Sequence, residues 1–478
     1  MQFEPVIGLE VHAQLAADTK LFCGCHYEYG GEPNSQTCPV CLGMPGVLPV
    51  LNRRAVEYAV KMGLATNCTI RPFSRFARKN YFYPDLPKGY QISQYDEPLC
   101  YDGSITLALE DGTQKSVGIT RIHLEEDAGK SIHTEREGTL VDFNRCGVPL
   151  IEIVSEPDIR SPEEARAYLN KLKQILEYLE ISDCNMEKGS LRCDANISLR
   201  PVGEEPFGVK TEMKNMNSFR GVERALQFEI NRQTEVLQSG GTITQDTLLW
   251  NETENHAERM RTKEEAEDYR YFPEPDLLPL EVSEQWREQI RESLPELPHS
   301  KQKRFIEQYQ IREYDAEVIT SAKALSQYYE DVVQQIGNPR LAANWIMGEV
   351  LRVLKEQDMT IQEFPINPDR FSGLLKRVED KTVTQNAAKQ VFFAMVDGPK
   401  TADEIIEDQG LKQVTDTARL ESIVEKVIKD NPEEYEKYKS GNPQLSKFFM
   451  GQVMRETRGK ANPRKVNAIL DEKLGPAE

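Results

Sequence analysis

The segment VIGLEVHAQL, residues 6–15, gives the first indication of the fold. Its odd positions are apolar from Ile7 to Leu15, while its even positions from 10 to 14 carry Glu10, His12 and Gln14. Successive side chains of a β-strand point to opposite faces, so this alternation predicts a strand with one apolar and one polar face. Such strands belong to antiparallel sheets that bury one face in a core.

Four further segments show the same kind of polar face. Residues 117–125 set Arg121, His123 and Glu125 against apolar neighbours, and residues 148–154 carry Glu152 within an apolar run. Residues 191–200 and 209–214 alternate throughout, and their polar positions are Arg192, Asp194, Asn196, Ser198, Arg200, Lys210, Glu212 and Lys214. We therefore expect five strands to present polar side chains on a common face of one sheet.

The composition of this polar face separates two interpretations. A merely solvated face is the usual explanation for any single strand, and such a face is typically rich in Ser, Thr, Gln and Lys. The five segments instead offer Glu, His, Asp, Asn and Arg, the side chains that hold divalent metal ions and phosphates. We interpret the face as a site for metal ions and a nucleotide on a curved sheet.

Neither of the common phosphate-binding loops is present in the sequence. Gly129-Lys130-Ser131 matches the end of a P-loop, but Leu124 stands where that motif needs a glycine, and no G-x-G-x-x-G occurs. This leaves ATP binding on the face of the sheet, where carboxylates hold the metal ions directly.

Four of the nine cysteines form two close pairs. Twelve residues separate the pair Cys23 and Cys25 from the pair Cys38 and Cys41, an arrangement that closes a tetrahedral zinc site. With sulfur in all four positions, such a zinc ion is structural; a reactive dithiol is the alternative, although no thioredoxin-like βαβ pattern surrounds the pairs. We interpret the scattered cysteines as small hydrophobic residues: Cys68, Cys100, Cys146, Cys184 and Cys193.

Composition and charge narrow the class of protein. The chain has 478 residues and a net charge of −19, from 59 basic and 78 acidic residues, and this length predicts about two to four domains. The negative charge argues against indiscriminate nucleic-acid binding, because each phosphate contact needs a cation. No stretch is long and apolar enough to span a bilayer, and residues 1–15 lack the features of a targeting segment, so we expect a cytosolic protein.

Two regions differ in their periodicity. The first part combines short strand patterns with a few helices, the clearest at residues 161–181, where Ser161 is expected to cap the helix and Glu164 to complete a capping box. From residue 301 onward the apolar spacing is helical, as for Leu351 with Leu354 and for Leu420 with Val424.

Two segments have the composition of nucleic-acid contacts. Residues 78–91 interleave bases with aromatic rings, as a single-stranded RNA end requires, although an ordered loop packed by its own tyrosines would look similar. Residues 447–465 contain a single acidic residue, Glu456, among the basic residues Lys447, Arg455, Arg458, Lys460, Arg464 and Lys465. Either a solvated helix face or a contact to a nucleic-acid backbone would explain this second patch.

Long motifs in these segments resemble one family closely, the B subunit of the bacterial aspartyl/glutamyl-tRNA amidotransferase (GatB). The matching stretches run essentially from end to end: Val6-IGLEVHAQL, Pro39-VCLGMPGVLP, Arg78-KNYFYPDLPKGYQISQ, His123-LEEDAGKS, Pro149-LIEIVSEPDIRSPEEA, Glu187-KGSLRCDANISLRP, Lys214-NMNSF, Asp268-YRYFPEPDLLPL and Arg458-GKANP. The resemblance implies an α+β fold in three parts. A mainly antiparallel cradle domain, similar to the glutamine synthetase catalytic fold and with a zinc-binding insert at residues 23–41, is expected at residues 1–292. An all-α helical domain at 293–400 and a small α-helical tail domain at 401–478, which contacts the tRNA body, are expected to follow.

The resemblance also implies a reaction. ATP phosphorylates the side-chain carboxyl of Glu misacylated on tRNA(Gln), or of Asp on tRNA(Asn), and ammonia then converts it to the amide. An amidase A subunit makes the ammonia from glutamine, and a small C subunit clasps the two larger subunits in a heterotrimer. The sequence leaves open which misacylated tRNA is used.

Strand phase and motif match together suggest individual roles. The expected catalytic residues are Glu10, His12, Glu125, Glu152 and Glu212, with Glu10, His12, Glu125 and Glu212 as Mg²⁺ ligands. The expected ATP and phosphate contacts are Arg192, Lys210, Lys214, Lys79 and Lys130. The expected contacts to the tRNA acceptor end are Asn80, Tyr81, Tyr83, Lys88 and Tyr90, and the patch at 447–465 is expected on the tRNA body.

Two other functions fit part of the pattern. One is a zinc-containing tRNA-binding scaffold without a kinase site, but its acidic face would repel RNA phosphates unless metal ions covered it. The other is a free-standing ammonia ligase of glutamine synthetase type, which leaves the helical remainder and its basic patch unexplained.

Overall fold

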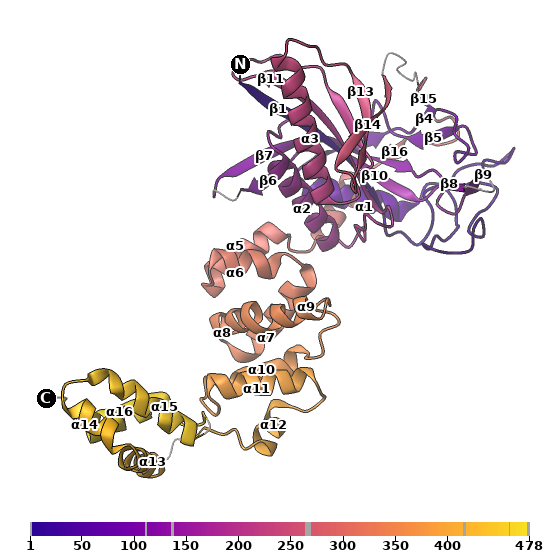
Figure 1. Cartoon of the computed structure of the whole chain (residues 1–478). Coiled ribbons are helices and arrows are strands. Elements are labelled where there is room, and N and C mark those ends of the chain that lie inside the picture. Colours follow the sequence, from indigo (N-terminus) through magenta and orange to yellow (C-terminus); the bar gives the residue numbers. More distant parts are fainter. Residues whose placement is uncertain are drawn as a thin grey trace. The chain divides into compact units, whose positions relative to one another are not determined.

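A computed structural model describes residues 2–109, 112–134, 138–262, 269–413, 417–457 and 459–475. The chain divides into two compact units, Met1–Pro298 and His299–Glu478. The first unit combines sheets with helices and the second is helical (Figure 1). A mixed α+β fold with a large sheet and a helical C-terminal region is thereby confirmed, while the domain limits at 292 and 400 stay predictions.

A single large sheet organises the first unit. In the described part of the chain it has the strand order β14-β13-β12-β11-β1-β10-β7-β6-β2, and neighbours are antiparallel except β12 and β13. From one edge to the other, the strands are β14 (His256–Thr262), β13 (Asp246–Asn251), β12 (Thr211–Lys214), β11 (Leu191–Pro201), β1 (Phe3–Gln14), β10 (Pro149–Ser155), β7 (Gln114–Glu126), β6 (Cys100–Ala108) and β2 (Thr69–Ile70). The five predicted strands are therefore β1, β7, β10, β11 and β12. The last is shorter than expected, because Val209 and Lys210 precede it.

Helices cover the apolar face of this sheet. The apolar positions of β1, including Ile7, Leu9 and Val11, are buried in one hydrophobic core together with residues of the helices. Those helices are α1 (Arg53–Ala65), α2 (Pro162–Tyr178) and α3 (Phe219–Gln238), and α2 and α3 pack side by side (Figure 1). The alternation in the sequence forms one buried and one polar face because apolar burial stabilises only one register.

Helix α2 confirms most of the sequence prediction at its N-terminus. The Ser161 side chain accepts a hydrogen bond from the Glu164 backbone N–H, and Pro162 occupies the first turn. The predicted capping box is wrong, because the Glu164 carboxylate accepts from the backbone N–H of Arg160 at 2.7 Å. It also pairs with Lys115, which lies far away in the sequence.

Among the described residues, three small sheets and a short helix complete the first unit. One joins β15 (Phe272–Pro273), β4 (Ala77–Asn80) and β5 (Tyr90–Ser93); the others pair β16 (Leu280–Glu281) with β3 (Phe73–Ser74) and β8 (Lys130–Thr134) with β9 (Gly138–Asp142). Helix α4 (Glu284–Glu292) comes last. The sheet of β15, β4 and β5 contains part of the predicted RNA-binding segment.

The described residues of the second unit form two hydrophobic cores. The first includes residues from Phe305 to Leu411, in α5 (Pro298–Tyr309), α6 (Glu313–Thr320), α7 (Lys323–Ile336), α8 (Pro339–Trp345), the π-helix η1 (Ile346–Val350), α9 (Leu351–Glu356), α10 (Pro368–Glu379), α11 (Gln385–Val396) and α12 (Ala402–Asp408). The second includes residues from Leu420 to Leu474, in α13 (Thr417–Asp430), α14 (Pro432–Lys439), the 3₁₀ turn η2 (Pro443–Leu445), α15 (Ser446–Glu456) and α16 (Pro463–Leu474). None of the helices in the described ranges combines the length and apolarity that crossing a membrane requires.

Candidate metal and nucleotide site

Strand register brings the predicted polar positions together. His12 of β1 lies opposite Glu152 of β10, and Glu152 lies opposite His123 of β7. On the other side of β1, Glu10 faces Asp194 and His12 faces Arg192, both on β11. All of these side chains therefore emerge on the face of the sheet that the helices do not cover.

The centre of this face is a cluster of carboxylates and histidines. His12 Nε2 lies 3.3 Å from Glu125 Oε1, 3.2 Å from Glu152 Oε2 and 3.8 Å from Glu10 Oε1. His123 Nε2 lies 3.8 Å from Glu125 Oε2 and 3.6 Å from Glu152 Oε2. Four strand-borne residues predicted from the sequence thus meet at one place, with His123 as a fifth member.

The cluster contains two sets of donors that could each hold a metal ion. One is Glu10, His12 and Glu152, and the other is His123, Glu125 and Glu152; within each set the donor atoms lie within 4.8 Å of one another. Glu152 belongs to both sets and could bridge two ions. His123 Nδ1 is buried without a hydrogen-bond partner, although buried ring nitrogens normally have one. Carboxylate and imidazole donors without thiols fit a hard or borderline divalent cation.

Burial, hydrogen bonds and neighbouring charges shift the pKa values of the cluster residues. Burial opposes the charged form of His12, but its hydrogen bonds to Glu125 and Glu152 raise the His12 pKa well above its usual value. Burial also opposes charge on Glu125, yet the bonds to His12 and His123 hold its pKa well below the usual range. Burial and the nearby Glu152 charge raise the pKa of Glu10. A divalent cation would take the place of the proton that His12 otherwise holds.

Cations surround the carboxylates. Arg192 donates to Asp127 at 3.1 and 3.2 Å, and Lys214 Nζ lies 2.5 Å from Asp194. Arg121 Nη2 lies 3.4 Å from Glu152 Oε1. Burial disfavours the charge on Lys79, but Glu125 and Glu152 lie close enough to raise its pKa. Three of the predicted phosphate contacts, Arg192, Lys214 and Lys79, therefore flank the cluster.

One predicted metal ligand, Glu212, and the two remaining predicted phosphate contacts, Lys210 and Lys130, lie outside the cluster. Glu212 is in neither donor set formed by the described residues; it pairs with Lys214 at 3.2 Å and accepts from Thr247 at 3.0 Å. Lys210 is exposed ahead of β12, and Lys130 is exposed at the start of the β8–β9 hairpin.

Asn80 holds a distant segment against β4. Its backbone N–H donates to the carbonyl of Tyr269 at 2.9 Å, and its side-chain amide donates to the carbonyl of Arg270 at 2.8 Å. Among the other predicted contacts to the tRNA end, Tyr81 is half-buried and donates from its hydroxyl to Gln91 at 3.4 Å, whereas Tyr83 is exposed. The structure thus gives Asn80 a scaffolding contact.

Arg78 reinforces the same connection. Its guanidinium donates to both oxygens of Glu274, at 2.7 and 2.9 Å, and to Asp276 at 3.1 Å, and it lies over the ring of Tyr90. The side chain of Glu274 is fully buried. This pair joins residues almost 200 positions apart.

We expect Arg78→Met to lower the free energy of unfolding of the first unit by about 3–5 kcal/mol, because it leaves the buried Glu274 carboxylate uncompensated. Urea unfolding followed by circular dichroism measures the change. The matched control is Arg75→Met, which removes an exposed pair with Glu97 at 3.8 Å and is expected to cost less than about 1 kcal/mol. Equal effects of the two substitutions would contradict the prediction.

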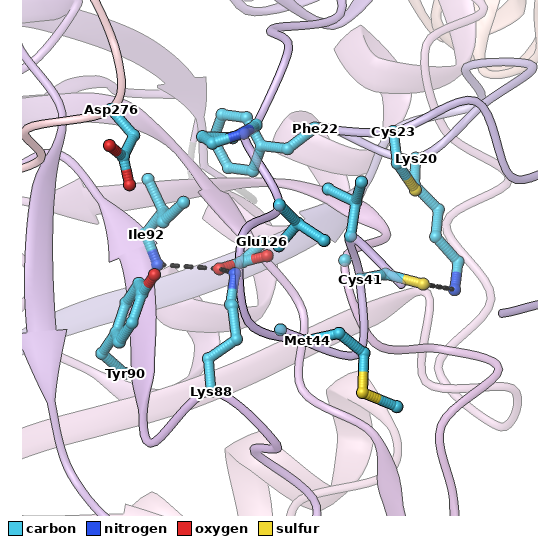
Figure 2. A pocket seen from close by; sticks show the side chains of 15 residues that line it. Lys20, Phe22, Cys23, Cys41, Met44, Lys88, Tyr90, Ile92, Glu126 and Asp276 are labelled. Carbon is cyan, nitrogen blue, oxygen red and sulfur yellow. Dashed lines mark hydrogen bonds and ion pairs between the residues drawn. The ribbon is translucent and has the colours of Figure 1, made fainter. Parts of the chain in front are cut away.

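Lys88 is turned away from solvent. It lines a cavity of about 130 Å³ between the cysteine loop and β5, and its Nζ pairs with the buried carboxylate of Glu126 (Figure 2). Glu126 also accepts from the backbone N–H of Ile92 at 2.9 Å. The structure therefore brings Lys88 to an internal ion pair, 5.3 Å from the ring of Tyr90.

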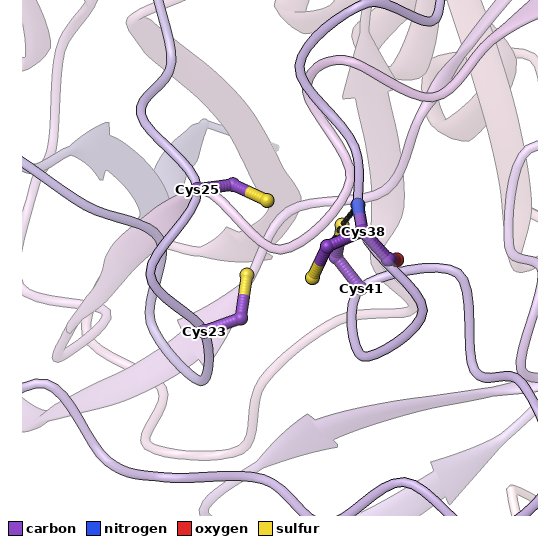
Figure 3. Close-up of side chains that lie close together, drawn as sticks. All are labelled: Cys23, Cys25, Cys38 and Cys41. Atoms are coloured by element: carbon purple, nitrogen blue, oxygen red, sulfur yellow. Dashed lines mark hydrogen bonds between the residues drawn. The ribbon is translucent and has the colours of Figure 1, made fainter.

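The four paired cysteines point toward one another. Cys23 and Cys25 approach from one part of the loop, and Cys38 and Cys41 from another (Figure 3). Their Sγ atoms all lie within 4.8 Å of one another. A tetrahedral zinc ion with bonds of about 2.3 Å separates its sulfur ligands by about 3.8 Å, so the set fits zinc after small adjustments.

The surroundings of Cys41 favour a thiolate. A hydrogen bond from the Cys23 thiol lowers the pKa of Cys41 to about 4, and the Cys38 backbone N–H donates to Cys41 Sγ at 3.2 Å. Lys20, which is almost fully buried, donates to the same sulfur at 3.5 Å. The five remaining cysteines are all buried, as predicted.

The basic patch of the second unit lies on α15 and around the start of α16. Lys447 and Arg455 are exposed on α15, Arg464 and Lys465 are exposed on α16, and Lys460 is half-buried between them. The predicted contact Arg458 lies outside the described residues. Glu456 pairs with Lys426, so its charge is directed away from the patch.

Several residues of the site were not among the predicted contacts. His123 was predicted on the polar face but was not assigned a role there. Asp127 continues the alternation of Arg121, His123 and Glu125, so the period of two could have identified it as well. Tyr269 and Tyr271 had a weaker signal, an alternation within a motif. Their proximity to Lys79 comes only from folding.

The fold and the clusters define a class of protein: a mixed α+β unit with a sheet face suited to divalent cations and phosphates, followed by a helical region. Residues 5–288 match the model of the GatB/GatE catalytic domain, and residues 327–474 match that of the GatB domain. The chain therefore belongs to the GatB family of amidotransferase B subunits.

Individual relatives agree with this assignment over their whole length. The chain is 56% identical to the B subunit of the aspartyl/glutamyl-tRNA(Asn/Gln) amidotransferase from Caldanaerobacter subterraneus, covering 99% of this chain and 100% of that relative. The proteins of the same name from Thermodesulfovibrio yellowstonii and Syntrophotalea carbinolica are 55% and 54% identical, over 98% and 99% of this chain and 99% of each relative. The enzyme class predicted from the motifs, a subunit of a tRNA-dependent amidotransferase, is confirmed.

Proposed function

We propose that this chain activates and amidates the side-chain carboxyl of Glu misacylated on tRNA(Gln), of Asp misacylated on tRNA(Asn), or of both. In the first step, a carboxylate oxygen takes the γ-phosphoryl group of ATP, which releases ADP. In the second, ammonia attacks the acyl carbon, the carbon–oxygen bond to phosphate breaks, and phosphate leaves with the loss of a proton. Phosphorylation is needed because a free carboxylate has no adequate leaving group.

The observation that carries this proposal is the pair of donor sets sharing Glu152. ATP and a carboxylate substrate repel each other, so their reaction needs positive charge between them. Glu10, His12, Glu125 and Glu152 would hold Mg²⁺, with His123 as a further ligand. When bound, Mg²⁺ would neutralise the oxygens of the phosphate and of the substrate carboxylate.

The surrounding side chains have complementary tasks in this scheme. Lys79, Arg192 and Lys214 would neutralise phosphate oxygens, and Asp127 and Asp194 keep two of these cations in place. These three cations are half-buried and already positioned. They therefore need little reorganisation when negative charge develops on the transferring phosphoryl group. Glu212 orients Lys214 at 3.2 Å, and we assign it this supporting role in place of metal binding.

We base the partner subunits, the cradle fold, the zinc ion and the contact with the tRNA body on what is expected for the GatB family. Ammonia would come from an amidase A subunit, and a small C subunit would complete the heterotrimer. The first 292 residues would form a cradle similar to glutamine synthetase, held near residues 23–41 by a structural zinc ion. The patch that includes Lys447 and Arg455 would contact the tRNA body, because its exposed bases can neutralise phosphates.

The decisive assay follows ADP release by the chain purified with its A and C partners, with ammonium and glutamine withheld. We expect release to be stimulated by misacylated tRNA and to remain at background with free glutamate or with uncharged tRNA. γ-Labelled ATP should also transfer its label to the misacylated tRNA. The uncharged tRNA serves as the control for RNA binding alone.

Each rival function predicts a different result in this assay. Stimulation by free glutamate would identify a free-standing ammonia ligase. Release of ADP that is independent of the bound amino acid would contradict the proposal, and tRNA binding without any ADP release would identify a scaffold.

A further inference from the structure

Five tyrosines from three separate segments form a continuous row in the first unit. Tyr83 and Tyr81 follow β4, Tyr95 follows β5, and Tyr269 and Tyr271 precede β15. Neighbouring ring centroids are 6.0 Å apart for Tyr83 and Tyr81, 6.1 Å for Tyr81 and Tyr269, and 6.0 Å for Tyr269 and Tyr271. Tyr271 and Tyr95 end the row as a parallel stack, at 4.1 Å and an angle of 6°.

The row is held rigidly at its centre. The backbone and side-chain amides of Asn80 donate to the carbonyls of Tyr269 and Arg270, and Phe272 pairs with Arg78 in the β15–β4 ladder. Because these hydrogen bonds fix the backbone that carries the rings, the rings lose little conformational entropy when a ligand binds.

The row is accessible from solvent at both ends. Tyr83 and Tyr95 are 51% and 54% exposed, while the three tyrosines between them are half-buried. Large exposed aromatic side chains are costly to leave in water, and a contiguous group of them is typical of a binding surface.

The row also passes beside the carboxylate–histidine cluster. Lys79 Nζ lies 4.8 Å from the ring centroid of Tyr269 and 5.8 Å from that of Tyr81. Burial, together with the nearby charges of Glu125 and Glu152, raises the pKa of Tyr271 to about 12. A ligand on these rings would therefore meet a cation on one side and the candidate metal site close by.

We propose that this tyrosine row is the platform on which the unpaired 3′ end of the tRNA stacks, with Tyr95 and Tyr271 receiving its terminal purine. The inference rests on the proposed function and extends it to Tyr95, Tyr269 and Tyr271. Stacking on tyrosine suits a single-stranded end, because every base offers an aromatic face. Lys79 complements the phosphates of the same strand.

The test measures the dissociation constant of uncharged tRNA(Gln) for the full-length chain purified with its partners. Loss of one stacked base is worth about 1–3 kcal/mol, so we expect Tyr271→Ala to raise this constant roughly 5- to 150-fold. Tyr271→Phe keeps the ring and is expected to stay within about twofold of the unchanged protein. The same measurement on tRNA lacking its 3′-terminal adenosine should show little difference between Tyr271→Ala and the unchanged protein.

The outcomes separate this proposal from its rivals. An unchanged dissociation constant for Tyr271→Ala, or an equal loss on the shortened tRNA, would overturn it. A raised KM for ATP with unchanged tRNA affinity would assign the ring to the adenine of ATP and would also overturn it. Because binding is read without catalysis, an absence of ADP release would count against the proposed function alone.

Discussion

Glu152→Gln is expected to lower tRNA-dependent ADP release about a thousandfold. Glu152 is the one carboxylate shared by the two donor sets among the described residues, and it is 5% exposed. The amide keeps the shape of the side chain but removes the charge on which both candidate metal positions depend. Loss of a single preorganised transition-state contact costs about 100- to 1000-fold, and this substitution weakens two positions together.

Two measurements distinguish metal loss from misfolding. The Mg²⁺ concentration that gives half-maximal ADP release should rise in Glu152→Gln, while the far-UV circular dichroism spectrum stays the same. The matched control is Glu156→Gln, which removes one negative charge just beyond the same strand, where Glu156 accepts from Thr120 at 2.7 Å. We expect the control to stay within about threefold. Retention of more than a tenth of the activity by Glu152→Gln would contradict a shared metal site.

Glu10→Gln is expected to cause a smaller loss of ADP release than Glu152→Gln. Glu10 belongs to one donor set only, and its carboxylate is more exposed than that of Glu152. Its replacement should therefore reduce ADP release by less than the replacement of Glu152. The reverse order would place the centre of the metal site nearer Glu10 and would contradict the sharing of Glu152 by two ions.

Cys38→Ser is expected to reduce tightly bound zinc from about one ion per chain to less than about a tenth. Four sulfurs converge on one point in the loop, and binding of a structural zinc ion by such sites is worth about 10–16 kcal/mol in small domains. A hydroxyl at one position is a much poorer ligand for zinc. Metal analysis after dialysis against a chelator measures the change.

The effect on structure should be local. The first unit buries an extensive hydrophobic core of its own, so its secondary structure should persist after the metal is lost, while residues 23–41 become sensitive to proteolysis. Cys184→Ala is the matched control, because Cys184 is a buried cysteine outside the cluster and its loss should leave the zinc content unchanged. Full retention of zinc by Cys38→Ser would refute the assignment.

The polar face could be predicted because the period of a strand is a local property. Glu10 and His12 alternate with apolar residues that the core buries, and the same reasoning identified Glu125, Glu152 and Arg192. Which of these side chains meet is not a local property. Glu212 has the same phase as the others, but its strand lies two positions from β1, and its carboxylate contacts Lys214 instead of the histidines.

The aromatic segment shows the same division between local and distant information. The composition of residues 78–91 indicated an RNA-binding loop, but did not reveal that Lys88 turns inward to Glu126. Nor did it show that Asn80 holds Tyr269 from a segment about 190 residues away. Glu164 failed as a capping residue for a related reason, since Arg160 and Lys115 offer its carboxylate other donors.

The alternation of β1, the cysteine spacing and the motifs of the family could be recognised in the amino-acid sequence, because each depends on neighbours within a few positions. The membership of Glu152 in two donor sets and the row of five tyrosines could not be recognised there, since they arise only when distant segments fold together. These arrangements depend on strand register and on contacts such as that of Arg78 with Glu274. Long-range packing selects them, because a shift of one residue would turn the polar face into the core.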